Sequence, residues 1–358
     1  MVTAAASPAT GSPAPSSPGP AAPRRRPLRA LTSRRRRVSA LIATALAGVL
    51  LASCGLQSGG ALPLSVGPGS ITSDPDLEGV KLTVGSKDFT ENIILGYIAE
   101  FALAAAGAEI RDLTDIQGSN SARAAMEAGQ VDLYIDYTGT GWINYLHNEH
   151  PIPDSQKQFE AVKKEDLERN GIVWAAPAPM DNTYALAASQ QVVQDTGVRT
   201  LSDYANLVNT HPGSITTCVE TEFNSRQDGF PGMAAVYGFN PDDAGKKILQ
   251  TGIIYQATAA GGECTFGEVF TTDGRIKGLN LYVLEDDKQF FPHYNAAVTM
   301  REQVYKDHPQ IVTVLAPVMK EITNDEISTL NAKVDVDGEE PADVARQWLV
   351  DKGFVTDG

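Results

Sequence analysis

A repeated alternation of short apolar runs and helical segments, beginning at Val80, constrains the fold of this chain more than any other feature. Val80–Val84 alternates apolar and polar residues, which is typical of a half-buried strand, and helical spacing follows from about Thr90 to Ala106. Further strands are expected near 109–116 and 131–135, with a short helix between them. This order of strand, helix, strand, helix, strand predicts an α/β sheet.

The same rhythm returns later in the chain and predicts a second lobe. Strands are expected over 183–188, 213–219 and 279–284, with a helix near 231–237. The tail from Thr299 onward has helical spacing throughout. Because the rhythm repeats after a change of register, we expect two α/β lobes.

The chain is expected to cross between these lobes twice, near Asp181–Thr183 and again near Phe291–Tyr294. Two crossings make a hinge, and the cleft between two hinged lobes is a natural place for a small ligand. The predicted lobes are residues 80–182 together with 292–358, and an inserted lobe of residues 183–291.

The first 53 residues predict export. After a disordered extension rich in Ala, Pro, Ser and Gly, a basic run over Arg24–Arg37 precedes an apolar segment over Val38–Ser53. This segment is shorter than the roughly 20 residues that a membrane-spanning helix needs, so it predicts a signal peptide. It ends in Leu51-Ala52-Ser53-Cys54, which resembles the lipobox of bacterial lipoproteins and implies cleavage before Cys54 and a lipid on its sulfur. A plain secretion signal and a twin-arginine signal are the alternatives.

The chain after the signal peptide is strongly acidic. The whole chain carries a formal net charge of −15, and its first 53 residues contain eight arginines and no acidic residue, so the remainder is more acidic still. Such a body is a poor partner for phosphate backbones, and we expect no nucleic-acid binding. Residues 54–79, rich in Gly, Ser and Pro, are expected to form a flexible tether. Cys218 and Cys264 lie in the exported body, where they either form a disulfide or remain buried thiols.

Motifs for nucleotide binding and catalysis are missing from the sequence. It has no phosphate-binding P-loop, no dinucleotide-binding glycine motif, no zinc-protease motif and no nucleophile elbow. His147 and His150 are close together, but a surface loop explains this pair better than a metal site, because no third ligand motif stands nearby. We therefore predict no cofactor, no metal and no enzymatic activity.

Polar and aromatic residues follow the predicted strands at the edge where ligands bind in open α/β sheets. Lys87 follows the first strand, and Tyr137 and Thr140 follow the third. If these strands are neighbours, a cation, an aromatic face and a hydroxyl converge on one crevice. Each residue alone has a simpler interpretation, because a lysine at a helix start is usually solvated and a tyrosine at a strand end usually packs.

Six segments in a fixed order support the ligand-site interpretation. Together they resemble the ProX-like substrate-binding proteins of osmoprotectant ABC importers, which bind glycine betaine, carnitine, choline and related quaternary amines. The resemblance covers about residues 80–355 and implies a two-lobed type II periplasmic-binding-protein fold. It also implies separate permease and ATPase subunits as partners of an extracytoplasmic protein held to the membrane by its lipid. The segments are Gly85–Glu91, Asp136–Thr140, Asn182–Leu186, Arg226–Gly229, Phe270–Ile276, and Leu284–Lys288 with Phe291–Tyr294.

The resemblance further implies which side chains bind the ligand. A quaternary ammonium has no N–H to donate, so the negative faces of aromatic rings are its suitable partner. A carboxylate instead binds the fork of an arginine or the point charge of a lysine. The matching residues are Tyr137, Tyr184, Phe270 and Tyr294 for an aromatic cage, and Lys87, Thr140 and Arg226 for a carboxylate clamp.

Two of the positions implied by the resemblance bear on the choice of ligand. Phe270 stands where many relatives carry tyrosine and lacks a hydroxyl that could orient the ring. Thr140, beside two cations, favours a zwitterion, so glycine betaine and other betaines are ranked above choline. Three alternatives stay open: an enzyme, a tethered sensor or adhesion lipoprotein, and a binding protein of the same fold for an amino acid or an aromatic acid.

Overall fold

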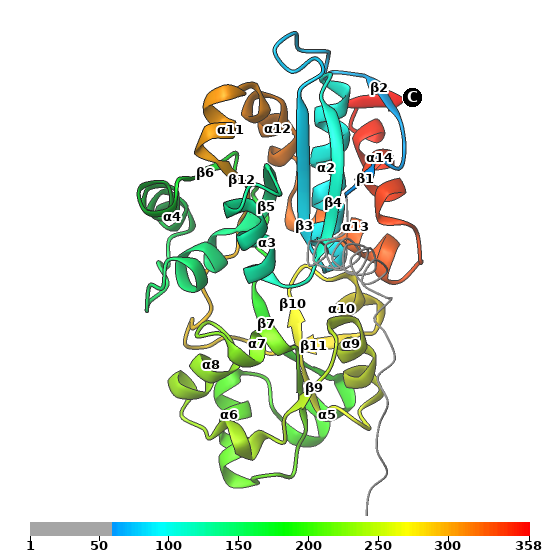
Figure 1. Ribbon diagram of the computed structural model, residues 1–358. Coiled ribbons are helices and arrows are strands. Elements are labelled where there is room, and N and C mark those ends of the chain that lie inside the picture. Colours follow the sequence, from blue (N-terminus) through cyan, green and yellow to red (C-terminus); the bar gives the residue numbers. More distant parts are fainter. Residues whose placement is uncertain (1–58) are drawn as a thin grey trace, which may run out of the picture. The chain divides into compact units, whose positions relative to one another are not determined.

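The structure is a computed structural model and describes residues 59–358. The chain divides into two compact units, residues 1–55 and 56–358, and every described element belongs to the second. The predicted signal peptide and the predicted lipidation site Cys54 lie outside the described residues. The described part is a mixed α/β structure with one sheet of six strands and one of five, each in its own lobe (Figure 1).

The first lobe is built on the six-stranded sheet, in the order β1-β4-β3-β5-β12-β6. Its centre is parallel, because β3 pairs in parallel with both β4 and β5, while β12 is antiparallel to β5 and β6. The neighbouring strands β3 and β5 therefore end at the same edge, as the α/β prediction requires. The strands are β1 (Gly60–Ala61), β3 (Lys81–Lys87), β4 (Glu109–Ile116), β5 (Leu133–Tyr137), β6 (Ile172–Ala175) and β12 (Ala296–Arg301).

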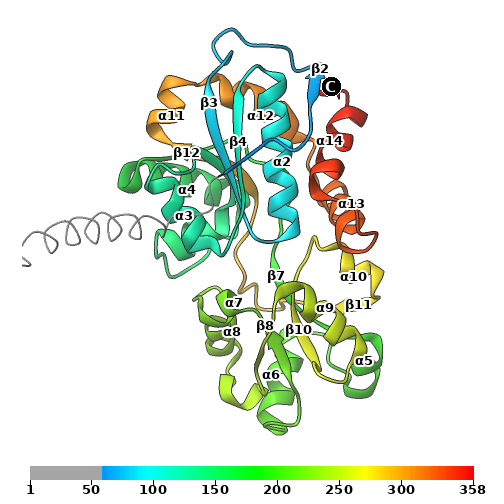
Figure 2. The same cartoon turned by 45° about the vertical axis from the view of Figure 1, so that its right-hand side comes forward.

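Helix α2 is the central helix of this lobe and packs closely on the sheet, with α12, α13 and α14 against it (Figures 1 and 2). Gly96 permits this approach, because a Cβ there would lie 3.0 Å from Cγ2 of Thr114 and 3.2 Å from Cβ of Ser86. The helices are α2 (Thr90–Ala105), α3 (Ser119–Glu127), the π-helix η1 (Thr140–Tyr145), α4 (Ser155–Asn170), α11 (Glu302–Asp307), α12 (Gln310–Lys320), α13 (Asn324–Asp335) and α14 (Pro341–Asp351).

The second lobe is built on the five-stranded sheet, in the order β11-β7-β10-β8-β9. Cys218 on β8 and Cys264 just before β10 form a disulfide across two parallel strands, with their Cα atoms 5.6 Å apart. The strands are β7 (Tyr184–Ser189), β8 (Thr217–Val219), β9 (Lys247–Ile248), β10 (Phe266–Phe270) and β11 (Leu281–Val283). The helices are α5 (Gln190–Thr196), α6 (Leu201–Thr210), α7 (Thr221–Ser225), α8 (Phe230–Tyr237), the 3-10 helix η2 (Pro241–Ala244), α9 (Thr251–Ala260) and α10 (Gly274–Gly278).

Two chain segments connect the lobes and lie side by side. Asp181 and Asn295 form an antiparallel bridge, and Oδ1 of Asp181 accepts a hydrogen bond from the backbone N–H of Tyr294 at 2.7 Å. The outgoing segment leads into β7 and the returning segment into β12 (Figure 2). The second sheet is thus inserted between β6 and β12 of the first.

Residues 59–79 are not a flexible tether, which corrects the expectation for most of residues 54–79. β1 pairs with β4, and β2 (Val66–Pro68) pairs with β13 (Val355–Asp357) near the end of the chain. Leu77 is fully buried in the core of the first lobe. Strand pairing and the buried side chains of Ile71 and Leu77 hold this segment on the first lobe despite its many glycines, serines and prolines.

The tail is not helical throughout, which is a second correction. β12 continues to Arg301 and lies inside the sheet between β5 and β6, and β13 forms a strand at the end of the chain. A strand that is covered on both faces shows a continuous apolar run in place of alternation. The buried run Ala296–Met300 is apolar except for Thr299, and its spacing cannot be told from that of a buried helix.

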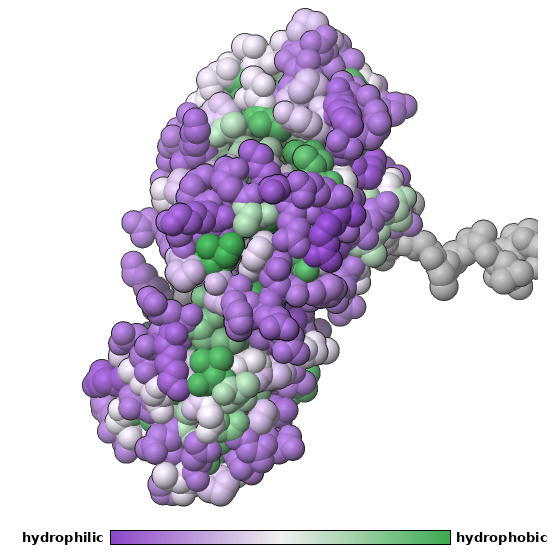
Figure 3. Space-filling model, turned by 90° about the vertical axis from the view of Figure 1, so that its left-hand side faces the viewer, coloured by the Kyte–Doolittle hydropathy of each residue, from purple (hydrophilic) through white to green (hydrophobic). Residues whose placement is uncertain are grey.

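One face of the described part is mainly polar. The face in Figure 3 is largely hydrophilic, with hydrophobic side chains in small separate groups. No helix within residues 59–358 combines the length and hydropathy of a membrane span. The large hydrophobic side chains with substantial exposure are Leu167, Val236, Ile248, Ile253, Tyr305 and Val336.

Candidate functional site

A cavity of about 650 Å³ lies between the lobes and is lined by residues of both. This volume is in the range of small-molecule sites. The structure brings together all the residues that the sequence predicted for the site, and these line the cavity: Lys87, Tyr137, Thr140, Tyr184, Arg226, Phe270 and Tyr294.

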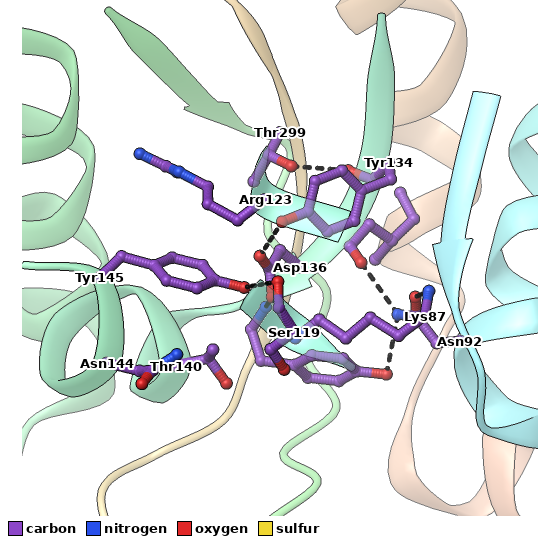
Figure 4. Close-up of polar contacts among 12 residues, drawn as sticks. Lys87, Asn92, Ser119, Arg123, Tyr134, Asp136, Thr140, Asn144, Tyr145 and Thr299 are labelled. Atoms are coloured by element: carbon purple, nitrogen blue, oxygen red, sulfur yellow. Dashed lines mark hydrogen bonds and ion pairs between the residues drawn. The ribbon is translucent and has the colours of Figure 1, made fainter. Parts of the chain in front are cut away.

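The first lobe contributes Lys87, Tyr137 and Thr140 from the ends of two neighbouring strands. Lys87 is the last residue of β3, Tyr137 is the last residue of β5, and Thr140 begins the π-helix η1. Nζ of Lys87 lies 5.1 Å from the centre of the Tyr137 ring. The predicted convergence at the carboxyl ends of the strands is therefore present, and Figure 4 shows Lys87 and Thr140 near Asp136.

The second lobe contributes an aromatic pair and an arginine. Tyr184 begins β7 and Phe270 ends β10, and the two residues face each other in the antiparallel register of these strands. Their rings are 5.1 Å apart between centres. Arg226 ends the short helix α7, with its guanidinium carbon 5.7 Å from the centre of the Tyr184 ring.

Five aromatic rings form a continuous chain along the cavity. The centre of the Phe89 ring is 5.8 Å from that of Tyr137 and 5.2 Å from that of Phe270, and the Tyr184 ring continues the chain to Tyr294 at 5.4 Å. Sequence reasoning missed Phe89 as a site residue. Its position two residues after Lys87, just before the first turn of α2, was the available signal.

The charge of Lys87 is paired inside the protein. Its Nζ lies 2.6 Å from Oδ1 of Asp136, and both side chains are almost fully buried. Asp136 also accepts hydrogen bonds from the hydroxyl of Tyr134 at 2.5 Å and from the backbone N–H of Tyr137 at 2.8 Å (Figure 4). Lys87 has three N–H groups, and Asp136 is its ion-pair partner among the described residues, so N–H groups remain for a ligand.

The guanidinium of Arg226 is held by two carboxylates and a hydroxyl. It donates to Asp228 at 2.7 and 2.5 Å, to Glu222 at 2.6 Å and to Thr140 at 3.3 Å. Burial acts to lower the pKa of Arg226, but Asp228, with Tyr184 and Tyr294, outweighs it and raises the pKa further above its ordinary value. Asp228 also accepts a hydrogen bond from the hydroxyl of Tyr294 at 2.7 Å, which fixes that ring.

Acidic residues of the second lobe line the same cavity and were missed by sequence reasoning. Glu220, Glu222 and Glu268 all lie on its wall. One oxygen of Glu268 accepts a hydrogen bond from the backbone N–H of Glu220 at 2.6 Å. Burial raises the pKa of Glu268 to about 8. The chain is so rich in acidic residues that no sequence signal separated these three from the rest.

A buried carboxylate connects the cage to the hinge. Glu91 accepts hydrogen bonds from the hydroxyl of Tyr137 and the amide of Asn182, each at 2.8 Å. Its other oxygen accepts from Thr272 at 2.5 Å and from Asn331 at 3.1 Å. Burial raises the pKa of Glu91 above its ordinary range, and the four donors act against that rise.

In this arrangement a ligand would meet the faces of aromatic rings, next to two buried cations and several carboxylates. Aromatic faces attract a cation, and the free N–H groups beside them suit an acceptor oxygen. Within residues 59–358, no group of three or more His, Cys, Asp or Glu side chains is placed to hold a metal ion.

Comparison with known proteins gives consistent findings. A family model described as the substrate-binding domain of an ABC-type glycine betaine transport system matches residues 80–351. A glycine-betaine-binding protein of Pseudomonas aeruginosa is 35% identical over 282 residues, which cover 77% of this chain and 89% of that protein. An ergothioneine transport permease/ergothioneine binding protein of Helicobacter pylori is 32% identical over 275 residues, which cover 76% of this chain and 48% of that protein. A crystal structure of a glycine betaine/carnitine/choline ABC transporter matches with a TM-score of 0.61 and 25% identity, over 77% of this chain and 99% of that one.

Proposed function

The chain belongs to the family of substrate-binding domains of ABC-type glycine betaine transport systems, and from that premise we propose that it captures a quaternary-ammonium osmolyte in the cavity between its lobes. Glycine betaine or a related betaine is the first candidate, and carnitine and choline follow. The observation that carries the proposal is the chain of five aromatic rings beside Lys87 and Arg226.

The rings suit the cationic end of such a ligand. A trimethylammonium group cannot donate a hydrogen bond, and each desolvated contact with an aromatic face stabilises it by about 2 kcal/mol. Tyr137 and Tyr294 meet this requirement best, because hydrogen bonds from their hydroxyls to Glu91 and Asp228 hold both rings in place. A ring that is already fixed loses little entropy when the ligand binds.

The other end of the ligand would meet the clamp. Lys87, Thr140 and Arg226 lie on the same cavity, and the contact between Arg226 and Thr140 crosses from one lobe to the other. A carboxylate bound there would bridge the lobes and favour the closed arrangement. The proposed role is capture and release of an unchanged ligand, without turnover.

The N-terminal sequence supports a cellular location for this role. We propose that the signal peptide is removed before Cys54, that lipid on this cysteine anchors the protein to the outer face of the cell membrane, and that separate permease and ATPase subunits carry out transport. Mass spectrometry of the mature N-terminus tests the anchor: a free cysteine, or cleavage elsewhere, argues against it. Deletion of the gene separates transport from sensing, because loss of uptake is expected only for a transport component.

Calorimetric titration of the compact unit 56–358 tests which ligand the protein binds. This unit contains both sheets and their cores, so it is expected to fold alone. We expect saturable binding of glycine betaine, and roughly 30-fold weaker binding in Tyr137→Ala and in Tyr294→Ala. Tyr305→Ala, which removes an exposed ring outside the cavity, is the control and is expected to bind normally.

Titration with choline, carnitine and proline betaine ranks the candidate ligands by affinity. Titration with ergothioneine tests the ligand in the name of the Helicobacter relative. Failure of all quaternary amines to bind a folded sample would refute the proposal.

A further inference from the structure

Glu222 joins the two lobes at the clamp. Its Oε1 accepts a hydrogen bond from Nη1 of Arg226 at 2.6 Å, within the second lobe. Its Oε2 accepts one from the backbone N–H of Ser119 at 3.0 Å, and Ser119 is the first residue of α3 in the first lobe. The Glu222 side chain is 24% exposed, so it lies on the cavity wall without being free in solvent.

These two partners are the kind that bind anions in proteins. The first turn of a helix has unpaired backbone N–H groups and the positive end of the helix dipole, and arginine forms strong bonds with carboxylates. Burial acts to raise the pKa of Glu222, but the charges of Arg226 and Lys87 and the hydrogen bond from Ser119 outweigh it and lower the pKa to about 2. Glu222 therefore carries its full negative charge at neutral pH.

The charges around the clamp do not balance. Lys87 is paired with Asp136, and Arg226 is paired with Asp228. Glu222 is a second carboxylate paired with Arg226, so Lys87, Arg226 and their partners amount to two cations and three carboxylates. A ligand carboxylate that approaches Lys87 and Arg226 is repelled by Glu222 and competes with it for the same donors, whereas an uncharged hydroxyl is not.

On the basis of the proposed function, we propose that Glu222 is a specificity-determining residue. It occupies the anion-binding position formed by Arg226 and the first turn of α3. There it lowers the affinity for quaternary amines with a carboxylate relative to those with an uncharged end. Thr140, Lys87 and Arg226 favour a betaine, and Glu222 narrows that preference. One side chain outside the predicted clamp thus shifts the balance between betaines and choline.

The test compares Glu222→Gln with the wild type in the unit 56–358, using glycine betaine and choline as the two probes. Glutamine has the same size and keeps one acceptor oxygen, but it has no charge. The ratio of the two dissociation constants is the readout, because a general loss of folding or closure weakens both ligands together. We expect Glu222→Gln to shift this ratio roughly tenfold toward glycine betaine.

Asp115→Asn is the matched control. Asp115 lines the same cavity, and its side chain makes no hydrogen bond among the described residues, so the variant removes one negative charge without touching Arg226 or Ser119. The backbone of Asp115 has a φ of 64°, a conformation that asparagine tolerates well. We expect its ratio to change much less than the ratio in Glu222→Gln, because the Asp115 carboxylate bonds neither Arg226 nor the start of α3.

The outcomes separate this inference from the proposed function. A tenfold shift in Glu222→Gln with little change in Asp115→Asn supports the role of Glu222. If the wild type binds both ligands and the ratio in Glu222→Gln stays the same or moves toward choline, Glu222 only holds Arg226 in place and the inference is wrong while the proposed function stands. An equal shift in both variants assigns the effect to general charge and also overturns the inference. If the folded wild type binds neither ligand, the proposed function fails first.

Discussion

At the scale of single residues, Phe89 links the aromatic rings of the two lobes. Its ring contacts Tyr137 of the first lobe and Phe270 of the second, so it closes a gap that the four predicted rings leave open. Phe270 lacks a hydroxyl, and its position is instead fixed by the stacked Phe89 ring and by the pairing of β10 with β7. Loss of a hydroxyl at this position is therefore compensated by packing.

We expect Phe89→Leu to weaken the binding of a quaternary amine roughly tenfold, because leucine fills the space but has no π face. The thermal midpoint is expected to stay close to that of the wild type, since Phe89 is only partly buried. Titration and calorimetric unfolding measure the two effects. Phe354→Leu, the same change at a partly buried ring that packs on Trp348, is the control, and an equal loss of affinity in both variants would argue against a direct role of Phe89.

Glu100 is a buried carboxyl group without a partner that stabilises its charge. Neither of its oxygens accepts a hydrogen bond among the described residues, and its charged neighbour is another carboxylate, Asp112. Burial, with the charge of Asp112, raises the pKa of Glu100 from 4.5 to about 10. The folded protein therefore holds a proton that the unfolded chain releases between these pH values, so this group makes folding less favourable as the pH rises through that window.

We expect Glu100→Gln to remove this dependence. Relative to the wild type, the variant should gain about 1.4 kcal/mol of unfolding free energy for each pH unit in the lower part of that window. Denaturant unfolding at pH 5, 7 and 9 measures the difference between the two proteins. A difference that is constant or shrinks with pH would show that Glu100 is ionised in the folded state.

At the scale of elements, the strands that carry the site could be predicted and several that support it could not. β3 shows clear alternation, and the breaks in pattern after β3 and β5 placed Lys87 and Tyr137 at the same sheet edge, as the structure has them. β6, β10 and β12 are short or covered on both faces, and such runs have no period that separates them from helix. β12 is nevertheless the strand that returns the chain to the first sheet.

The carboxylates of the second lobe that line the cavity could not be predicted either, for a different reason. Glu222 and Glu268 come from α7 and β10, which adjoin only after the second sheet has formed. Local sequence carries no information on such a contact, because it depends on the pairing of β8 with β10 over a long separation. The six segments supplied the cations and rings, and they also contain Asp136 and Asp228, which pair with the two cations. The placement of Glu222 and Glu268 on the cavity wall emerges only from the fold.

At the scale of the whole described molecule, a few polar contacts join the two lobes. Arg226 reaches Thr140 at 3.3 Å, Glu222 reaches Ser119 at 3.0 Å, and Thr272 reaches Glu91 at 2.5 Å. Two of these three pairs lie at the clamp and the third lies behind the cage. The contacts thus surround the proposed ligand on two sides, so occupancy of the cavity and closure of the lobes are expected to be coupled.

Glu91 is the contact behind the cage, and its replacement tests that coupling. Its carboxylate accepts hydrogen bonds from the hydroxyl of Tyr137, from the amide of Asn182 at the hinge and from the hydroxyl of Thr272. In Glu91→Gln an amide N–H₂ replaces one acceptor oxygen and faces groups that themselves donate, which leaves buried donors unsatisfied at a cost of about 1–3 kcal/mol. Closure should become less favourable, with ligand affinity lowered roughly tenfold and a smaller decrease in the radius of gyration on addition of ligand.

Glu100→Gln is the matched control for this experiment, because it changes the same residue type on the same helix α2, also fully buried, but away from the cavity. It is expected to bind and close like the wild type. Titration and small-angle scattering of the two variants, with and without glycine betaine, then separate a general effect of losing a buried carboxylate from an effect on the hinge. Wild-type affinity and compaction in Glu91→Gln would mean that the clamp alone closes the lobes and that Glu91 only orients the Tyr137 ring.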